Sequence, residues 1–392
     1  MRPAGFQAGG ELTIGSVSYT IERLTTLAVP DTDAAFFDPS FLELAGGWLL
    51  RSGIQEATGG VARYYRTDLA RNAPVSTEIT GYAASALLYL HARTGEARYR
   101  EQALAAGHFL TRTAWDRELA VMPFEVGAPN GQAYFFDSGI IARGLVALWR
   151  RSGEAEFLET AERCAESMAR DFGAGSEFHA ILELPSKKPA ARDRRWSRGP
   201  GCYQLKAGLA WLELAEATGR AEYGAHYERL LEYALGEQAS FLAGEPEGER
   251  VVDRLHAYCY FLEGLLACAE RPDCGLALGQ GLERAAELRD SAAGLLERSD
   301  VYAQLLRLRL FGAGLGAAPL DRKAAEREAA VILEFQAGGS DPRIAGGVYF
   351  GRKGAQTLPY VNPASTVFAM QALEMWRLWC AGEFKAEWRT LI

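Results

Sequence analysis

The feature that most constrains the fold is a repeated unit of two helices joined by nearly the same turn. The segments ARTGEARY (92–99), RRSGEAEF (150–157) and EATGRAEY (216–223) match almost residue for residue. Each segment follows an Ala- and Leu-rich stretch and precedes a stretch rich in Glu and Arg. Glycine at the shared position fits the left-handed residue that ends many helices. The chain is therefore built from internal repeats of helix pairs.

The pattern of apolar residues indicates how these pairs are arranged. The first helix of each pair is apolar nearly all round, which predicts burial on all sides, and the second is amphipathic. Two weaker pairs and a last apolar helix at 362–380 complete a series of six. We predict an all-α fold, an (α/α)6 toroid of six inner and about six outer helices. The helix at 39–53 would supply the sixth outer helix and join the two ends of the chain. An open superhelix is the alternative, but its end helices would need polar outer faces, which are missing here.

Short strand patterns lie between the helix pairs. Residues 118–136, around Pro-Asn-Gly, and residues 346–361 read as β-hairpins. Residues 1–36 are predicted to form an N-terminal strand segment, and residues 37–392 a single toroid domain. Since these loops precede inner helices, they would gather where the inner helices begin. We call that end of the ring the mouth, and loops on such a rigid scaffold are where function concentrates.

The composition excludes several classes of function. Fifty acidic against 42 basic side chains give a net charge of −8, which argues against a nucleic-acid partner. No apolar run reaches membrane-spanning length, and the first residues show no apolar signal region, so we expect a cytoplasmic protein without a membrane partner. The six cysteines form no CxxC pair and the five histidines no HExxH. We therefore predict no metal and no cofactor. The sequence gives no indication of oligomeric state.

Three segments carry a resemblance to known enzymes: TGYAASALLYLHARTGEARY, FFDSGIIARGLVALWRRSGEAEF and NPASTVFAMQALEMW. Their repeat pattern resembles the six-hairpin α/α toroid of carbohydrate-active enzymes. Unsaturated-glucuronyl hydrolases, uronyl epimerases and acylglucosamine epimerases share that architecture. The resemblance covers about residues 39–380 and implies a toroid fold and a saccharide substrate. It is one of architecture, so no catalytic residue is transferred from it.

The starts of the inner helices supply the candidate catalytic residues. Polar side chains there would converge at the mouth, and we select Glu78, Asp137, Asp300, Tyr82 and His256. Acids at helix starts also have a purely structural interpretation, as caps or as partners of the helix dipole. A buried tyrosine can simply pair with a carboxylate, and a single histidine on an apolar helix is more often a satisfied core residue.

Aromatic, amide and basic side chains near the same end are candidates for substrate binding. A sugar pocket combines apolar faces with a few polar groups. Loop 173–200 adds a crowd of basic residues around Trp196, which we interpret as a basic lip for an acidic sugar, since Arg binds carboxylates bidentately. A solvated loop is the structural alternative. The substrate-binding candidates are Tyr134, Trp196, Arg195, Arg198, Tyr203, Gln204, Tyr260, Tyr302, Tyr349, Tyr360 and Asn362.

These residues favour an enzyme acting on an acidic, uronate-type oligo- or polysaccharide. The first hypothesis is a glycoside hydrolase whose two carboxyl groups come from Glu78, Asp137 and Asp300. The second is a uronyl epimerase or lyase in which Tyr and His side chains move the proton next to a carboxylate. The third is a non-catalytic sugar-binding or assembly protein. The sequence does not fix the sugar, the linkage or the stereochemical outcome.

Overall fold

The computed structural model describes residues 40–392 except 129–130, 194 and 243–248. The N-terminal strand segment predicted for residues 1–36 lies outside the described residues. Twelve α-helices make up most of the described chain, and residues 38–392 form one compact unit. No described helix is both long and apolar enough to cross a membrane.

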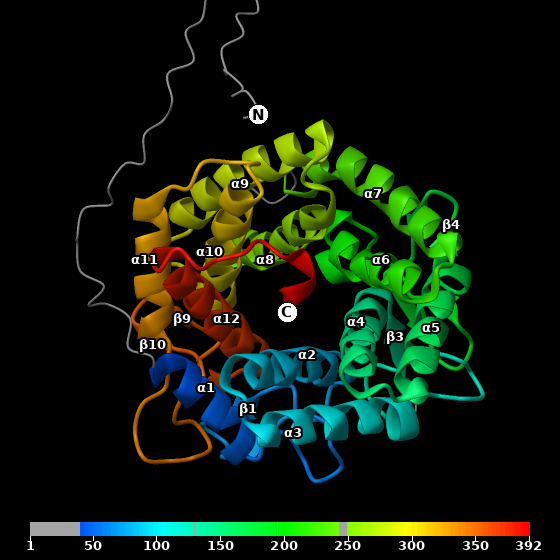
Figure 1. The fold of residues 1–392 in the computed structure, drawn as a ribbon, viewed down its shortest axis with the longest axis horizontal. Coiled ribbons are helices and arrows are strands. Elements are labelled where there is room, and N and C mark those ends of the chain that lie inside the picture. The colour runs from blue at the N-terminus through cyan, green and yellow to red at the C-terminus, as the bar shows by residue number, and fades with distance from the viewer. Residues whose placement is uncertain (1–39, 129–130, 194, 243–248) are drawn as a thin grey trace, which may run out of the picture. The chain divides into compact units, whose positions relative to one another are not determined.

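Six helices form the inner ring, and each is the first helix of a repeat. Each inner helix packs against the next one along the chain, and the last, α12, packs against the first, α2, so the ring is closed (Figure 1). The predicted toroid is thus confirmed. The inner helices are α2 (Thr77–Thr94), α4 (Phe135–Ser152), α6 (Leu205–Thr218), α8 (Glu249–Leu265), α10 (Ser299–Gly314) and α12 (Pro363–Cys380).

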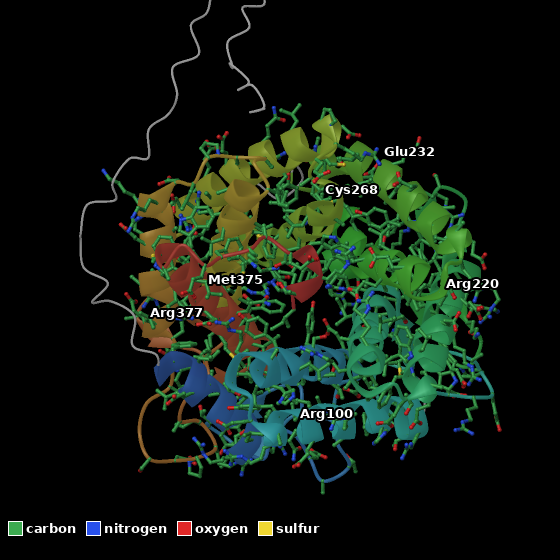
Figure 2. All side chains as sticks on the ribbon, in the orientation of Figure 1. Arg100, Arg220, Glu232, Cys268, Met375 and Arg377 are labelled. Carbon is green, nitrogen blue, oxygen red and sulfur yellow. The ribbon has the colours of Figure 1, made fainter. Side chains whose placement is uncertain are left out.

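The other six helices surround this ring. Five of them follow an inner helix and pack against it, while α1 packs against α12 and joins the two ends of the chain, as the sequence predicted. Charged side chains such as Arg100 on α3 and Glu232 on α7 are exposed on this outer side (Figure 2). The outer helices are α1 (Ser40–Arg51), α3 (Ala97–His108), α5 (Ala155–Arg170), α7 (Ala221–Phe241), α9 (Pro272–Ser291) and α11 (Arg322–Glu334).

The shared turns have the predicted geometry. Gly95, Gly153 and Gly219 end α2, α4 and α6 with φ of 74°, 75° and 73°. These are left-handed values that a residue with a Cβ adopts only at a cost, which explains why glycine recurs at this position.

Short strands pair the loops that precede different inner helices. Strand β1 (Tyr65–Arg66) before α2 pairs with β11 (Tyr360–Val361) before α12 and with β2 (Arg71–Asn72). Before α4, β3 (Gln132–Tyr134) pairs with β6 (Ile181–Glu183), which precedes α6 and also pairs with β7 (Lys188–Pro189). Strand β8 (Glu297–Arg298) before α10 pairs with β9 (Gly351–Lys353). Because these pairings tie the loops together, the inner helices begin at one end of the ring.

The two predicted hairpins have different outcomes. The one at 346–361 is confirmed, since β9 pairs with β10 (Gln356–Thr357). The one at 118–136 does not form a ladder of paired strands: one backbone hydrogen bond joins Phe124 to Gln132 at 2.7 Å, while β3 pairs with β6, far along the chain. A further small pair, β4 (Gly173–Ala174) with β5 (Glu177–Phe178), orders the start of loop 173–200.

Candidate active site

Two carboxyl groups stand at the starts of neighbouring inner helices. Glu78 is the second residue of α2 and Asp137 the third residue of α4, and these helices pack against each other. The cap of α2 is Ser76, whose hydroxyl accepts a hydrogen bond from the Ile79 amide at 3.4 Å. Tyr134 occupies the cap position of α4. Neither acid therefore serves as an N-cap, which removes the simplest structural explanation for both.

The electrostatics of this pair are unusual for carboxyl groups. Burial raises the pKa of Glu78 to about 7, opposed by the positive charges of Arg63 and Lys206. Burial also raises the pKa of Asp137 well above its ordinary value, and the nearby Glu78 charge raises it further. Asp137 is 6% exposed, and its Oδ2 atom is buried without a hydrogen-bond partner among the described residues. A buried acceptor left unpaired is costly, so this atom is suited to a group that a ligand supplies.

Arg63 lies beside the two acids, on the loop before β1. Its guanidinium forms an ion pair with Glu125 and lies 4.4 Å from the centre of the Phe124 ring. The Nε atom of Arg63 is buried and makes no hydrogen bond within the described chain. Arg63 therefore keeps donor capacity next to the carboxyl pair.

Aromatic side chains line the centre of the helical toroid next to Glu78 and Asp137. Tyr82, one turn beyond Glu78, packs edge-on against Phe368 of α12 at 5.2 Å between ring centres. Tyr260 of α8 lies 4.5 Å from Phe136 and 6.5 Å from Phe368. The hydroxyls of Tyr82 and Tyr260 are close enough to influence each other's pKa, yet the Tyr82 hydroxyl has no well-formed hydrogen bond.

His256 lies about two turns into α8, not in its first turn, since the helix begins at Glu249. Gln304 donates through Nε2 to the His256 carbonyl at 3.4 Å, which leaves its Oε1 to accept from His256 Nδ1 at 2.8 Å. This arrangement places the proton on Nδ1 and the free electron pair on Nε2. The imidazole ring lies 4.5 Å from the Tyr260 ring.

His256 is expected to stay neutral throughout the range in which enzymes usually work. Burial, and next the charge of Arg298, lower its pKa to about 4. In the folded protein the imidazole therefore takes up its proton near pH 4, well below the pKa of about 6.5 of a free histidine. Titration of the imidazole signals by NMR measures this, and a midpoint near 6.5 would contradict the assignment.

Asp300 belongs to a fixed ion pair. Arg298 donates to both of its oxygens, at 3.0 and 2.7 Å. Although burial alone raises a carboxyl pKa, Arg298 and His256 hold the pKa of Asp300 below its ordinary value. An acid held ionised in this way is unsuited to donate a proton, and Arg298 already engages both of its oxygens. Asp300 Oδ2 also lies 3.5 Å from His256 Nδ1.

A group of buried charged side chains lies deeper in the helical toroid, covered by these aromatic side chains. Lys206 lies within 5.1 Å of the centres of the Tyr82, Tyr260 and Phe368 rings and pairs with Glu263 at 2.7 Å. The Glu263 carboxylate also pairs with the buried guanidinium of Arg307. The carbonyl of Ile392 accepts hydrogen bonds from Lys206 and Arg307 at 3.0 and 3.2 Å, so the last residues occupy the middle of the ring (Figure 1).

Several other predicted binding residues lie on the loops around the mouth. Trp196 donates to Asp253 at 2.8 Å and packs against Tyr203 at 5.0 Å, while Tyr203 donates to the Gly199 carbonyl. Tyr134 packs against Phe124 at 4.9 Å. Gln204 is fully buried and uses its amide to hold the backbone at Gly201 and Phe178.

The remaining predicted residues contact other side chains and backbone groups. Tyr302 donates to Glu297 and lies over Arg289 of the outer helix α9. Asn362 caps α12 by accepting from the Ser365 amide. Tyr360 packs against Tyr64 and Arg66, and Tyr349 is partly exposed, with its carbonyl accepting from the Ser299 hydroxyl.

The basic loop is largely neutralised by its own acids. Arg195 pairs with Asp193 at 2.6 Å, and Arg198 approaches the same carboxylate at 3.5 Å. Lys187 pairs with Asp171 at 2.8 Å. Arg192 pairs with Glu177. The described cations of loop 173–200 therefore present less free positive charge than the sequence indicated.

One group of side chains among the described residues has the geometry of a metal site. His108, Glu154 and Glu156 bring ligand atoms within 4.8 Å of one another on the outer helices α3 and α5. Arg112 pairs with Glu156, and His108 bonds to Glu154 at 2.9 Å, so these atoms already have protein partners.

Solved structures with the same architecture support this description of the fold. A cellobiose 2-epimerase from Bacillus thermoamylovorans B4167 is 13% identical with a TM-score of 0.64, covering 86% of this chain and 97% of its own. A D-mannose isomerase is 12% identical with a TM-score of 0.63, covering 89% and 100%. A family 76 glycoside hydrolase from a bovine Bacteroides thetaiotaomicron strain is 10% identical with a TM-score of 0.57, covering 87% and 78%. The chain has the α/α-toroid fold. No family model and no curated protein matches it.

Three residues of the candidate active site were not selected from the sequence. Arg63 sits in an ordinary loop, and only the ring brings it to the acids. Lys206 did leave a signal, because it is a single lysine in an otherwise apolar stretch, LKAGLAWL. Gln304 shows its role only through its contact with His256.

Proposed function

We propose that this protein is a glycoside hydrolase that uses Glu78 and Asp137 as its carboxyl pair. The observation that carries the proposal is the raised pKa of both acids, side by side at the mouth, with an unpaired oxygen on Asp137. Two adjacent carboxyl groups that share protons at neutral pH can divide the roles of acid and base between them.

The roles follow from the charges around each acid. Asp137, whose pKa burial and the Glu78 charge raise well above its ordinary value, is the proposed acid and donates its proton to the glycosidic oxygen as the bond to the anomeric carbon breaks. Glu78 is ionised above about pH 7, helped by the positive charge of Arg63, and supplies the negative charge. Its carboxylate then attacks the anomeric carbon or removes a proton from the attacking water. The separation of the two carboxyl groups decides between these, with about 5–5.5 Å for retention and about 6.5–9.5 Å for inversion.

We propose an acidic, uronate-type saccharide as the substrate. Since the described cations of loop 173–200 mostly have acidic partners, Arg63 takes over the role first given to Arg195 and Arg198. Its guanidinium lies at the carboxyl pair with a buried, unpaired Nε. Guanidinium donors bind carboxylates in a fork, and a partly buried one does so with little screening. The cytoplasmic location stays a prediction from the sequence.

A second candidate is a uronyl epimerase, favoured by the geometry of His256. Its free Nε2 electron pair and its low pKa make it a neutral base at the centre of the ring. Tyr260 lies between His256 and the Glu78 side of the site and could return a proton from another direction. The structural likeness to two sugar-converting enzymes of the epimerase and isomerase type agrees with this second candidate.

One assay separates the two candidates. The protein is incubated in D2O with uronate-containing oligosaccharides and with the same oligosaccharides after reduction of their carboxyl groups. We expect new reducing ends from the acidic substrates and no deuterium at carbon. Deuterium at the carbon next to the carboxylate, without new reducing ends, would establish the epimerase. Equal cleavage of the carboxyl-reduced substrates would overturn the acidic specificity.

The pH dependence of hydrolysis is expected to follow the same two groups. Because Glu78 must be ionised, kcat/KM falls as the pH drops through about 7, the pKa of the free protein. Because Asp137 must be protonated, kcat/KM falls again at higher pH, when its raised pKa is passed. A profile from pH 4 to 10 measures both limbs. An acid limb near pH 4 would show that Glu78 is not the group being titrated.

A further inference from the structure

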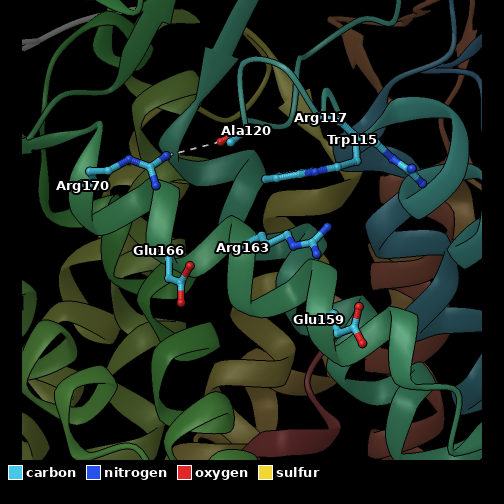
Figure 3. Close-up of a pocket in the computed structure, with 7 residues that line it drawn as sticks. All are labelled: Trp115, Arg117, Ala120, Glu159, Arg163, Glu166 and Arg170. Atoms are coloured by element: carbon cyan, nitrogen blue, oxygen red, sulfur yellow. Dashed lines mark hydrogen bonds between the residues drawn. The ribbon is translucent and has the colours of Figure 1, made fainter.

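A hollow lies on the outer side of the ring, at the face of α5. Its volume is about 500 Å³, within the range of about 300–1,000 Å³ that small-molecule sites occupy. Figure 3 shows its walls, which come from α5 and from the hairpin that follows α3. The side chains that line it include Trp115, Arg117, Glu159, Arg163, Glu166 and Arg170.

The two walls are held in place by the fold itself. Glu159, Arg163, Glu166 and Arg170 are spaced by four, three and four residues, which puts them on one side of α5. The opposite wall is a tight hairpin at 115–121, closed by two backbone hydrogen bonds between Asp116 and Val121 at 3.1 and 3.3 Å. A site whose walls are already in position loses little entropy when a ligand binds.

Two arginines that line this hollow have no acidic partner among the described residues. Within the described chain, Arg117 and Arg163 form no ion pair and no side-chain hydrogen bond, although acidic residues outnumber basic ones overall. Both side chains are exposed. Trp115, only 6% exposed, lies between the hairpin and α5 and adds an apolar edge beside them (Figure 3). Unpaired guanidinium groups next to an indole leave binding capacity for an anionic ligand with apolar faces.

The hollow continues along the surface. A second one of about 460 Å³ shares Glu166 and Arg170 with it and extends to Arg220 and Tyr223 at the start of α7. Because the two share lining residues, they form one groove that crosses α5. A groove of this kind fits an extended ligand better than a compact one.

We propose that this groove binds a uronate-containing saccharide chain, at a site separate from the carboxyl pair; the choice of ligand rests on the function proposed above. Arg117 and Arg163 would bind sugar carboxylates, and Glu159 would accept hydrogen bonds from sugar hydroxyls. Holding the polymer here would raise its local concentration at the protein, as a second linked site does.

The test is hydrogen–deuterium exchange of the full chain carrying Glu78→Gln, which prevents turnover, titrated with tetragalacturonate. We expect amide exchange in hairpin 115–121 to slow as tetragalacturonate binds. After Arg117→Glu and Arg163→Glu are added, the apparent affinity for tetragalacturonate, measured by this protection, should fall at least tenfold. The matched control is Arg151→Glu, an exposed arginine outside the groove, which should leave the effect unchanged.

Other outcomes would overturn this inference. They are no change in hairpin 115–121, an equal change with neutral maltotetraose, or an equal change with tetraglutamate, which would indicate a peptide site. Exchange in 75–82 and 135–139 reports separately on the carboxyl pair. Protection there without protection of the hairpin would support the proposed function and reject the groove.

Discussion

Replacement of Asp137 by Asn or of Glu78 by Gln is expected to lower kcat for glycosidic hydrolysis by about 10³-fold, a usual effect of removing a general acid or base. Both variants keep nearly the same volume, and neither acid caps its helix, so the fold should persist. The matched control is Glu101→Gln, an exposed acid on α3 outside both the carboxyl pair and the groove, which should keep full activity. Initial rates with the best acidic oligosaccharide measure the effect.

The leaving group distinguishes the two roles. A dinitrophenyl glycoside needs no protonation of its leaving oxygen, so Asp137→Asn should recover most of its activity on that substrate. Glu78→Gln should stay inactive, because the missing group is then the base or nucleophile. Loss of activity on the dinitrophenyl glycoside in both variants would contradict the assignment of Asp137 as the acid. Full activity of both variants, with loss in His256→Ala, would contradict the proposed carboxyl pair and assign the chemistry to His256.

The largest effect on stability is expected at Glu263. This side chain is fully buried and balances two buried cations, Lys206 and Arg307, from two other inner helices. Removing one partner of a buried ion pair leaves charge without compensation and costs about 3–5 kcal/mol. Glu263→Gln should therefore lower the free energy of unfolding by that amount, measured by urea denaturation.

A surface pair and a double variant complete this test. Glu326→Gln removes an exposed pair with Arg322 on α11, and the expected loss is below about 0.5 kcal/mol. Lys206→Met together with Glu263→Gln should cost about as much as Glu263→Gln alone, because burial lowers the pKa of Lys206 to about 7 and the charge left without a carboxylate is then that of Arg307. Equal losses in Glu263→Gln and Glu326→Gln would show that the buried layer does not hold the ring together.

The repeated turns made the architecture readable from the sequence. Left-handed glycine, an apolar helix before it and an amphipathic helix after it are all local properties, and five such pairs leave few arrangements other than a ring or a superhelix. The strand partner of residues 132–134 was not local, since it lies about fifty residues further along the chain. The Pro-Asn-Gly turn signal therefore predicted strand pairing within residues 118–136, whereas β3 pairs with β6.

The roles of the acids show the same division. Sequence selected Glu78, Asp137 and Asp300 as equals, because each stands at the start of an apolar helix. The structure separates them by their neighbours, with Arg298 holding Asp300 ionised while Asp137 keeps an unpaired oxygen. Burial and partner identity set a carboxyl pKa, and both depend on residues from other repeats.

The closed ring of helices could be predicted from the amino-acid sequence, because helix periodicity and glycine turns act over distances of a few residues. Which side chains meet at its centre depends on contacts between distant repeats. Arg63, Lys206 and the final residue Ile392 come from three distant parts of the chain, and closure of the helices brings them to the same place. Charge interactions depend on distance in space, and the separation of two residues along the chain does not give that distance.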